Sequence, residues 1–219
     1  MKTCVIMQPT YLPWLGYFDL IEKSDVFVFL DHVQFSKQSW QQRNRIRDKN
    51  GELLLTIPVK HNAIKESVIN SIQIDNGKNS LKKHLKSIQL NYRKAKNYGL
   101  YMDELELIYS REYEKLMDLN IELIKFGCKI LKIEPNFIYS SKLGVTGDRV
   151  ESLIDICHKV NAEKYLSPVG SKGYIEQNNI FSENGIELSY QNYQHPEYKQ
   201  VDFADFVSHL SFIDYIFNI

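Results

Sequence analysis

The sequence predicts an α/β fold: a single domain with a Rossmann-like, mostly parallel sheet and one helical insertion. Its length supports a single domain, because 219 residues with 43% hydrophobic content can bury a sizeable core. The order of its segments supports a parallel sheet, because two apolar runs near the N-terminus flank a short helical stretch, as in a βαβ unit. Strand-like segments return after a long helical stretch, which indicates that helices interrupt the sheet.

The first βαβ unit is the clearest sign of the parallel sheet. Residues 3–7 are β-branched and apolar, 15–22 can form a short helix, and 25–31 have the pattern of a buried strand. Two prolines bracket the loop between the first strand and the helix. This loop, residues 8–14, follows the carboxyl end of the first strand, and open α/β sheets bind ligands at that edge.

The middle of the chain predicts a hairpin and then helices. An Asn-Gly turn precedes a strand at 51–60, which could pair with residues 41–47. Apolar residues then recur at helical spacing over about 79–92, 102–110 and 112–130. We interpret residues 78–132 as a helical insertion within the α/β domain.

Strands resume in the last third of the chain. Strand patterns cover 136–143, 164–168 and 186–193, and a helix opens at Gly147-Asp148 and runs to about Val160. The chain ends in an apolar helix, residues 211–219, which could dock on its own core or on a second subunit of a homo-oligomer.

Charge and cysteine content narrow the functional classes. Lysine plus arginine equal aspartate plus glutamate at 27 each, so no global field attracts nucleic acid or an anionic membrane. The three cysteines lie in apolar segments without CxxC spacing, which favours buried thiols in a reducing cytoplasm over zinc. The N-terminal apolar run is too short for a signal peptide, and no segment has a membrane-spanning length. We expect a cytoplasmic protein with no metal and no bound cofactor.

The loop after the first strand concentrates side chains suited to binding. Tyr11, Trp14 and Tyr17 offer faces that could stack on a sugar or a base. Gln8 adds a side-chain amide, and Gly16 allows close approach of a ligand to the backbone. The alternative is a loop that only plugs the sheet edge. A glycine-rich phosphate cradle is not expected, because the loop carries no GxGxxG or GxxxxGK[ST] motif.

Asp31 ends the second predicted strand and should direct its carboxylate to the same edge. Polar and cationic residues follow it closely: Gln34, Lys37, Arg43 and Arg45. The cations could hold an anionic group while the acid orients an amine or a hydroxyl. The alternative is a structural salt-bridge network on a loop, with one of the arginines solvated.

A second group of candidates follows the last strand. His195 is the candidate general base, because histidine titrates near neutrality, and Tyr198 could donate a hydrogen bond to an oxyanion. Gln200 ends the same segment as a binding candidate, and His61 is the second candidate base. Ser167 belongs to a small polar loop that could bind an anion. The alternative for His195 is a structural role in capping a turn.

Motifs along the whole chain resemble those of the WbqC-like protein family. They are QPTYLPWLGYF (8–18), FVFLDHVQF (27–35), Lys37, Trp40, NRIR (44–47), KYLSPVGSKGYI (164–175), YQNYQHPEYKQ (190–200) and LSFIDYIFN (210–218). The resemblance implies a bacterial protein associated with O-antigen or other surface-polysaccharide gene clusters, with a suggested aminoacyl (glycine) transferase role. Trp40 enters the set of binding candidates through this signature.

The residues and the resemblance together lead to two hypotheses. In the first, the protein transfers an aminoacyl or related acyl group, from an aminoacyl donor or an acyl carrier protein, to an amino-sugar nucleotide. The aromatic loop would pack the sugar or nucleotide, the arginines would hold phosphate, and His195 would activate the sugar amine. In the second, the protein is a non-catalytic binding module that recognises a nucleotide-sugar or a carrier protein.

Overall fold

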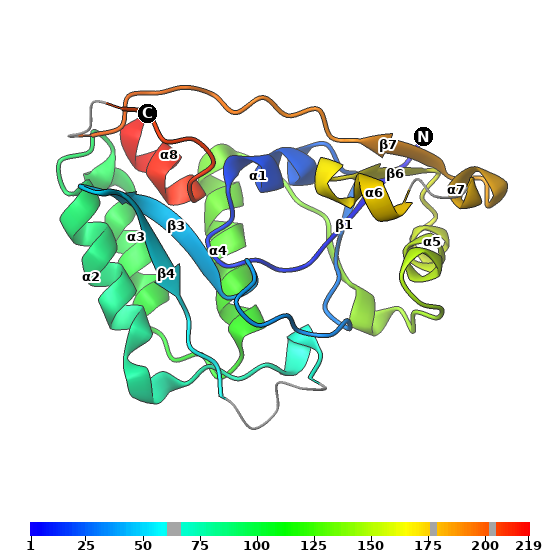
Figure 1. Ribbon diagram of the computed structural model, residues 1–219, viewed down its shortest axis with the longest axis horizontal. Coiled ribbons are helices and arrows are strands. Elements are labelled where there is room, and N and C mark those ends of the chain that lie inside the picture. Colours follow the sequence, from blue (N-terminus) through cyan, green and yellow to red (C-terminus); the bar gives the residue numbers. More distant parts are fainter. Residues whose placement is uncertain (61–66, 176–178, 202–204) are drawn as a thin grey trace. The chain divides into compact units, whose positions relative to one another are not determined.

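A computed structural model describes residues 1–60, 67–175, 179–201 and 205–219 (Figure 1). The chain forms two compact units. The sheet unit contains residues 1–8, 16–32 and 132–194, and the helical unit contains residues 9–15, 33–131 and 195–219. Each unit is therefore assembled from several separate segments of the chain.

The sheet unit is built on five parallel strands in the order β5-β2-β1-β6-β7. The strands are β1 (Thr3–Met7), β2 (Val26–Phe29), β5 (Phe137–Tyr139), β6 (Lys164–Ser167) and β7 (Glu187–Tyr190). The helices are α1 (Leu15–Glu22), α5 (Val150–Lys159), α6 (Lys172–Ile175) and α7 (Ile180–Glu183), with short 3-10 turns η4 (Ser140–Lys142) and η5 (Val169–Ser171). The predicted α/β fold with a parallel sheet is confirmed.

Strand β2 shows why these sequences form a parallel sheet covered on both faces. Val26 and Val28 belong to a core cluster that includes Ile156 of α5. The alternate residues Phe27 and Phe29 point to the other face, where the Phe27 ring lies 5.4 Å from that of Tyr17 in α1. A strand buried on both faces is continuously apolar rather than alternating, as VFVF is.

The helical unit combines a hairpin with a helical bundle. Its elements are β3 (Arg43–Asp48), β4 (Gly51–Thr56), η2 (Ile69–Ser71), η3 (Asn76–Lys78), α2 (Ser80–Tyr92), α3 (Tyr98–Ser110), α4 (Leu116–Leu131) and α8 (Phe212–Asn218). Strands β3 and β4 are antiparallel in full register, and the turn between them needs the positive φ of Gly51. The predicted insertion at residues 78–132 contains α2, α3 and α4.

The C-terminal helix α8 docks within the helical unit. It packs against α3 and β3, and Phe212, Ile213, Ile216 and Phe217 are all buried within the single chain. Of the two docking sites expected from sequence, the structure places this helix on the protein's own core. No helix among the described residues is long and apolar enough to cross a bilayer.

The expectation of a single folding domain stays a prediction, and unfolding tests it. The chain passes between the units at residues 8–9, 15–16, 32–33, 131–132 and 194–195, so neither unit is one continuous segment. We expect one cooperative urea transition. Fluorescence of Trp14 and Trp40 reports on the helical unit, and thiol reactivity of Cys4 and Cys157 reports on the sheet unit.

The thiol measurement uses a Cys128→Ser variant, because Cys128 is the cysteine of the helical unit. Coincident midpoints from the two probes support one folding domain. Midpoints separated by more than the fitting error would show that the units unfold independently.

Candidate functional site

Residues 9–15, here called the proline loop, are held by two buried asparagines. The Nδ2 group of Asn44 donates to the carbonyl oxygens of Tyr11 (3.2 Å) and Leu12 (2.8 Å). The Nδ2 group of Asn120 donates to the carbonyl oxygen of Pro9 at 3.2 Å. These bonds satisfy backbone carbonyls that have no partner in a strand or helix.

The proline loop also fixes the segment that precedes α8. Trp14 and Ser211 pair in an antiparallel bridge, and the Phe212 N–H donates to the Pro13 carbonyl at 2.8 Å. Leu12 is fully buried with φ of 44°, a conformation that a bulky side chain rarely adopts. The surrounding hydrogen bonds hold this strained turn and so fix the direction of the chain at Trp14.

Beneath the loop lies a buried polar network. The Tyr11 hydroxyl is 2.8 Å from Nδ1 of His84 and 2.5 Å from the Tyr109 hydroxyl. Burial lowers the pKa of His84 from 6.5 to about 4, against an opposing effect of the Thr56 backbone, so the imidazole is neutral at pH 7. Tyr11, a predicted substrate contact, is fully buried and anchors the loop from below.

Five aromatic side chains, Trp14, His195, Tyr198, Phe206 and His209, gather beside the proline loop and are called the ring cluster. The Trp14 and His195 rings are nearly parallel, at 7°, with centroids 6.5 Å apart. His209 lies 5.1 Å from Trp14 and 4.8 Å from His195. The structure thus brings together three residues predicted from sequence, Trp14, His195 and Tyr198, and adds a second histidine to them.

The protonation state of His195 follows from its surroundings. Its Nδ1 lies 2.9 Å from the Pro196 carbonyl oxygen, and because a carbonyl only accepts, Nδ1 carries the proton. In the neutral ring, Nε2 then carries the lone pair that a general base uses. Burial lowers the pKa of His195 below its ordinary value, and nearby His209 lowers it further, while the Pro196 carbonyl and Asp214 oppose the shift. His195 is therefore a neutral base at pH 7.

A buried carboxylate anchors the segment that carries His195. Asp214 of α8 is 0% exposed and accepts hydrogen bonds from Tyr92 (2.8 Å), Tyr198 (2.7 Å) and Gln200 (2.7 Å). Burial raises the pKa of Asp214, and these hydrogen bonds oppose the shift. The Tyr198 proton is thus directed to Asp214, and donation from this hydroxyl to an oxyanion stays a prediction.

One face of β3 presents three arginines, called the arginine face. Arg43, Arg45 and Arg47 alternate with buried Asn44 and Ile46, as the period of a strand requires. The buried Arg47 guanidinium is used within the fold, because it donates to backbone carbonyls. Arg43 is half-buried and forms no side-chain hydrogen bond or ion pair with any residue that the structure describes.

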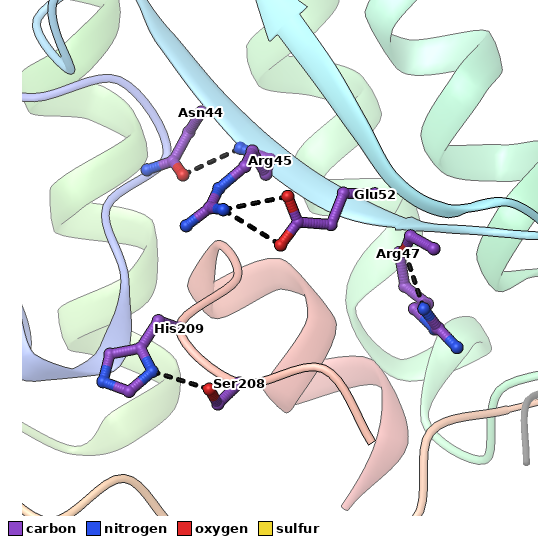
Figure 2. Close-up of polar contacts among 7 residues, drawn as sticks. Asn44, Arg45, Arg47, Glu52, Ser208 and His209 are labelled. Carbon is purple, nitrogen blue, oxygen red and sulfur yellow. Dashed lines mark hydrogen bonds and ion pairs between the residues drawn. The ribbon is translucent and has the colours of Figure 1, made fainter. Parts of the chain in front are cut away.

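Arg45 lies between a carboxylate and an aromatic ring. Its Nη1 is 2.9 Å from both carboxylate oxygens of Glu52 (Figure 2), and its guanidinium carbon is 5.4 Å from the centroid of the Trp40 ring. Its Nε is buried without a hydrogen-bond partner in the described part of the chain. Trp40 itself is 50% exposed, so its ring can still contact a ligand.

The arginine face and the ring cluster are connected through the backbone. The Ser211 N–H donates to the Arg45 carbonyl at 2.8 Å, two residues after His209. In Figure 2 the Arg45 side chain extends from the hairpin toward the segment that carries Ser208 and His209. His209 adopts a φ of 60°, and its Nδ1 lies 2.8 Å from the Ser208 hydroxyl. Cations, imidazoles and aromatic faces therefore occur together within the helical unit.

Gln34, Lys37 and Gln200 were predicted to bind substrate, and that role stays a prediction. Gln34 is exposed and pairs through its backbone with Val68, and Lys37 is exposed. Gln200 is buried and binds the Val207 backbone as both donor and acceptor, besides Asp214. His61 lies outside the described residues.

Asp31, a predicted catalytic residue, belongs to the sheet unit. Its buried carboxylate accepts from the hydroxyls of Ser140 (2.9 Å) and Ser141 (2.6 Å) and from the Ser141 N–H (2.8 Å). These three donors satisfy the buried carboxylate and fix the turn after β5. The arrangement is that of a structural carboxylate, and a catalytic role stays a prediction.

Gln8, Gly16 and Ser167 also belong to the sheet unit, and their roles in binding stay predictions. The Gln8 carbonyl accepts from the Tyr17 hydroxyl at 3.0 Å, and the Gly16 carbonyl accepts from Gln191 at 2.7 Å. Ser167 is fully buried. Within the described residues, no three histidine, cysteine or acidic side chains come together in a way that could hold a metal ion.

Comparison with known proteins identifies the family. The model of the WbqC-like protein family matches residues 8–219. The chain belongs to the WbqC-like protein family. The uncharacterized protein Rv1507c of Mycobacterium tuberculosis is 30% identical over 226 residues, which cover 100% of this chain and 94% of that relative. No solved structure gave a significant match.

The WbqC-like chain also contains functional candidates that sequence reasoning missed. Asp214 was overlooked because it lies in an apolar C-terminal helix, although a lone acid in SFIDYIF is itself a signal of a buried polar contact. His209 lies in a segment without regular secondary structure, and no spacing pattern links it to His195 or to Trp14. Both residues act through contacts that only the fold creates.

The neutral state of buried His84 predicts acid sensitivity of this WbqC-like protein. Between pH 6.5 and about 4 the imidazole is protonated in the unfolded chain and neutral in the folded one, so stability falls as the pH falls through this range. Between pH 7 and pH 4.5 the free energy of unfolding should fall by about 2 kcal/mol more in wild type than in His84→Gln. Urea unfolding at both pH values measures this difference. The control is His158→Gln, on the exposed face of α5, which should lose as much stability between pH 7 and 4.5 as wild type does. Equal losses of stability in wild type and His84→Gln would contradict the neutral state of buried His84.

Removal of the Asn44 amide should weaken the fold. Asn44→Ala leaves the buried carbonyls of Tyr11 and Leu12 without this donor, and we expect the free energy of unfolding to fall by about 2 to 3 kcal/mol. Asn50→Ala, at the exposed hairpin turn, is the control and should change stability by less than about 0.5 kcal/mol. Equal stabilities of the two variants in urea unfolding would show that the asparagine does not hold the loop.

Proposed function

We propose that this WbqC-like protein is a cytoplasmic transferase of bacterial surface-polysaccharide (O-antigen) biosynthesis, which passes an aminoacyl or related acyl group to the amine of an amino-sugar nucleotide. The observation that carries the proposal is the state of His195. Its pKa is lowered by burial, and its Nδ1 proton is committed to the Pro196 carbonyl. A half-buried neutral imidazole with its lone pair on Nε2 is the form required of a general base.

In the proposed reaction, the sugar amine attacks the acyl carbonyl directly. A C–N bond forms, the bond between the acyl carbon and the donor's leaving group breaks, and Nε2 of His195 takes the proton that the amine loses. The same proton can then pass to the leaving group, so the enzyme returns to its starting state. No covalent enzyme intermediate is needed. The donor is an aminoacyl donor or an acyl carrier protein.

The arginine face supports an anionic substrate. Arg43 and Arg45 supply guanidinium groups that match the geometry of a phosphate, and Arg43 has no competing partner among the described residues. The exposed ring of Trp40 and the ring of Trp14 offer faces for a sugar or a base. Binding through these groups would position the amine for reaction, which is a large part of the rate advantage in a two-substrate transfer.

A binding module is the second candidate, and the Tyr198 contact favours it. Acyl transfer benefits from a donor to the developing oxyanion, and the Tyr198 hydroxyl already donates to Asp214. The same rings and arginines would then recognise a nucleotide-sugar or a carrier protein without chemistry.

Substitution of His195 separates the two candidates. For a transferase, His195→Gln should lower kcat by about 100-fold or more with little change in KM, whereas Arg43→Ala should mainly raise KM. Formation of the acylated sugar nucleotide is measured by mass spectrometry with aminoacyl and pantetheine thioester donors and UDP-linked amino sugars. Activity should fall below neutral pH as His195 becomes protonated.

His158→Gln, on the exposed face of α5, controls for a general effect of removing a histidine. Full transfer activity in folded His195→Gln removes the general-base assignment. Saturable ligand binding by wild type, with no product from any donor, favours the binding module.

A further inference from the structure

The strand order of the sheet unit reverses at β1. From β1 the chain moves to β2 on one side and later returns to place β6 and β7 on the other side, which gives the order β5-β2-β1-β6-β7. The helices that follow β1 and β6 cover opposite faces. Tyr17 of α1 contacts Phe27, whereas Phe181 of α7 stacks on Tyr165 in the cluster that contains Cys4. Open α/β sheets bind ligands beyond the carboxyl ends of the strands at this kind of reversal.

The pairing of β1 with β6 stops early. The two strands are in register at Thr3–Lys164 and Cys4–Tyr165 only, although β1 continues to Met7 and β6 to Ser167. By contrast, the pairing of β1 with β2 and that of β6 with β7 both continue to the carboxyl ends of the strands. The carboxyl halves of β1 and β6 are therefore the place where the sheet's own ladder is interrupted.

The loop after β6 has a fixed shape. The Ser171 hydroxyl donates to the Pro168 carbonyl at 2.7 Å and lies 2.5 Å from the Ser167 hydroxyl, which also donates to the Tyr165 hydroxyl at 3.4 Å. Both serine hydroxyls are buried. This pairing gives Ser167 a role in shaping the loop rather than in touching a ligand.

The surface of the same loop offers a cation and an apolar contact. Val169 is 57% exposed, and a side chain added at Gly170 would meet no atom within 4 Å. Lys172 is exposed, with its Nζ 5.6 Å from the ring centroid of Tyr190, the last residue of β7. An ammonium group binds phosphate as a point charge, while an apolar side chain and an aromatic ring suit a base or a sugar.

We propose that the sheet unit binds a nucleoside phosphate at the carboxyl ends of β1 and β6, with Lys172 on the phosphate and Val169 and Tyr190 against the base or sugar. The proposal does not depend on the proposed function, which assigns the phosphate of the acceptor sugar nucleotide to the arginine face.

Calorimetric titration of the full chain with UDP, a UDP-linked amino sugar, AMP and inorganic phosphate tests the site. Lys172→Ala should weaken nucleotide binding about tenfold or more, the loss of a charge-assisted contact. Lys164→Ala is the matched control. Lys164 lies at the amino end of β6, away from the proposed site, and forms an ion pair with Glu187. This control should change affinity less than about twofold.

Gly170→Val provides a second variant that does not depend on charge. The space around Gly170 accepts a side chain, so the variant should fold normally and still weaken the binding of UDP or AMP. The uridine ligands and AMP then distinguish a uridine nucleotide from an adenine nucleotide at this site. Either result supports the site when Lys172→Ala weakens it.

Three results would overturn the site: no heat with any nucleotide, equal affinities of Lys172→Ala and Lys164→Ala, or binding lost in Arg43→Ala and retained in Lys172→Ala. The last result would move nucleotide binding to the arginine face and leave the proposed transfer intact. The proposed transfer is tested separately, by product formation in wild type and in His195→Gln, and that test does not involve Lys172.

Discussion

Buried backbone carbonyls in the proline loop need hydrogen-bond donors, and this constraint organises the helical unit. The loop has neither a ladder nor a helix to satisfy them, so Asn44 and Asn120 supply side-chain amides. A buried carbonyl without a partner costs about 1 to 3 kcal/mol, so the two amides decide whether the loop can be buried at all. Asn44 lies on β3, and the loop is therefore fixed to the strand that also carries the arginine face.

The rest of the helical unit's candidate site follows from that anchoring. The loop carbonyl at Pro13 and the bridge at Trp14 fix the start of α8, which in turn positions Asp214. Asp214 then holds Tyr198 and Gln200, and through them the segment that carries His195. The segment that carries His195 is thus positioned by a chain of hydrogen bonds that begins at a strained leucine turn.

Local patterns were enough to predict the elements of the fold. The strand at residues 3–7 and the helix at 15–22 were predicted with the bounds that the structure has, because alternation, turn chemistry and helical spacing are local properties. Partners distant in sequence were not predictable in this way. Asp31 meets Ser140 across 109 positions, and Tyr92 meets Asp214 across 122. The residues of the site were recognised by chemical type, but their division between two units depends on contacts that no local pattern encodes.

The partners of the arginines argue for a ligand on the arginine face. The chain has as many acidic as basic residues, so a shortage of carboxylates does not explain why Arg43 lacks one among the described residues. Neighbouring Arg45 has Glu52, and Arg47 is used by backbone carbonyls. A half-buried guanidinium loses part of its hydration and gains nothing in return unless an anion completes it. In the proposed function, a substrate phosphate is the anion that pairs with Arg43, and this contact would recover part of the hydration energy that the guanidinium loses in the free protein.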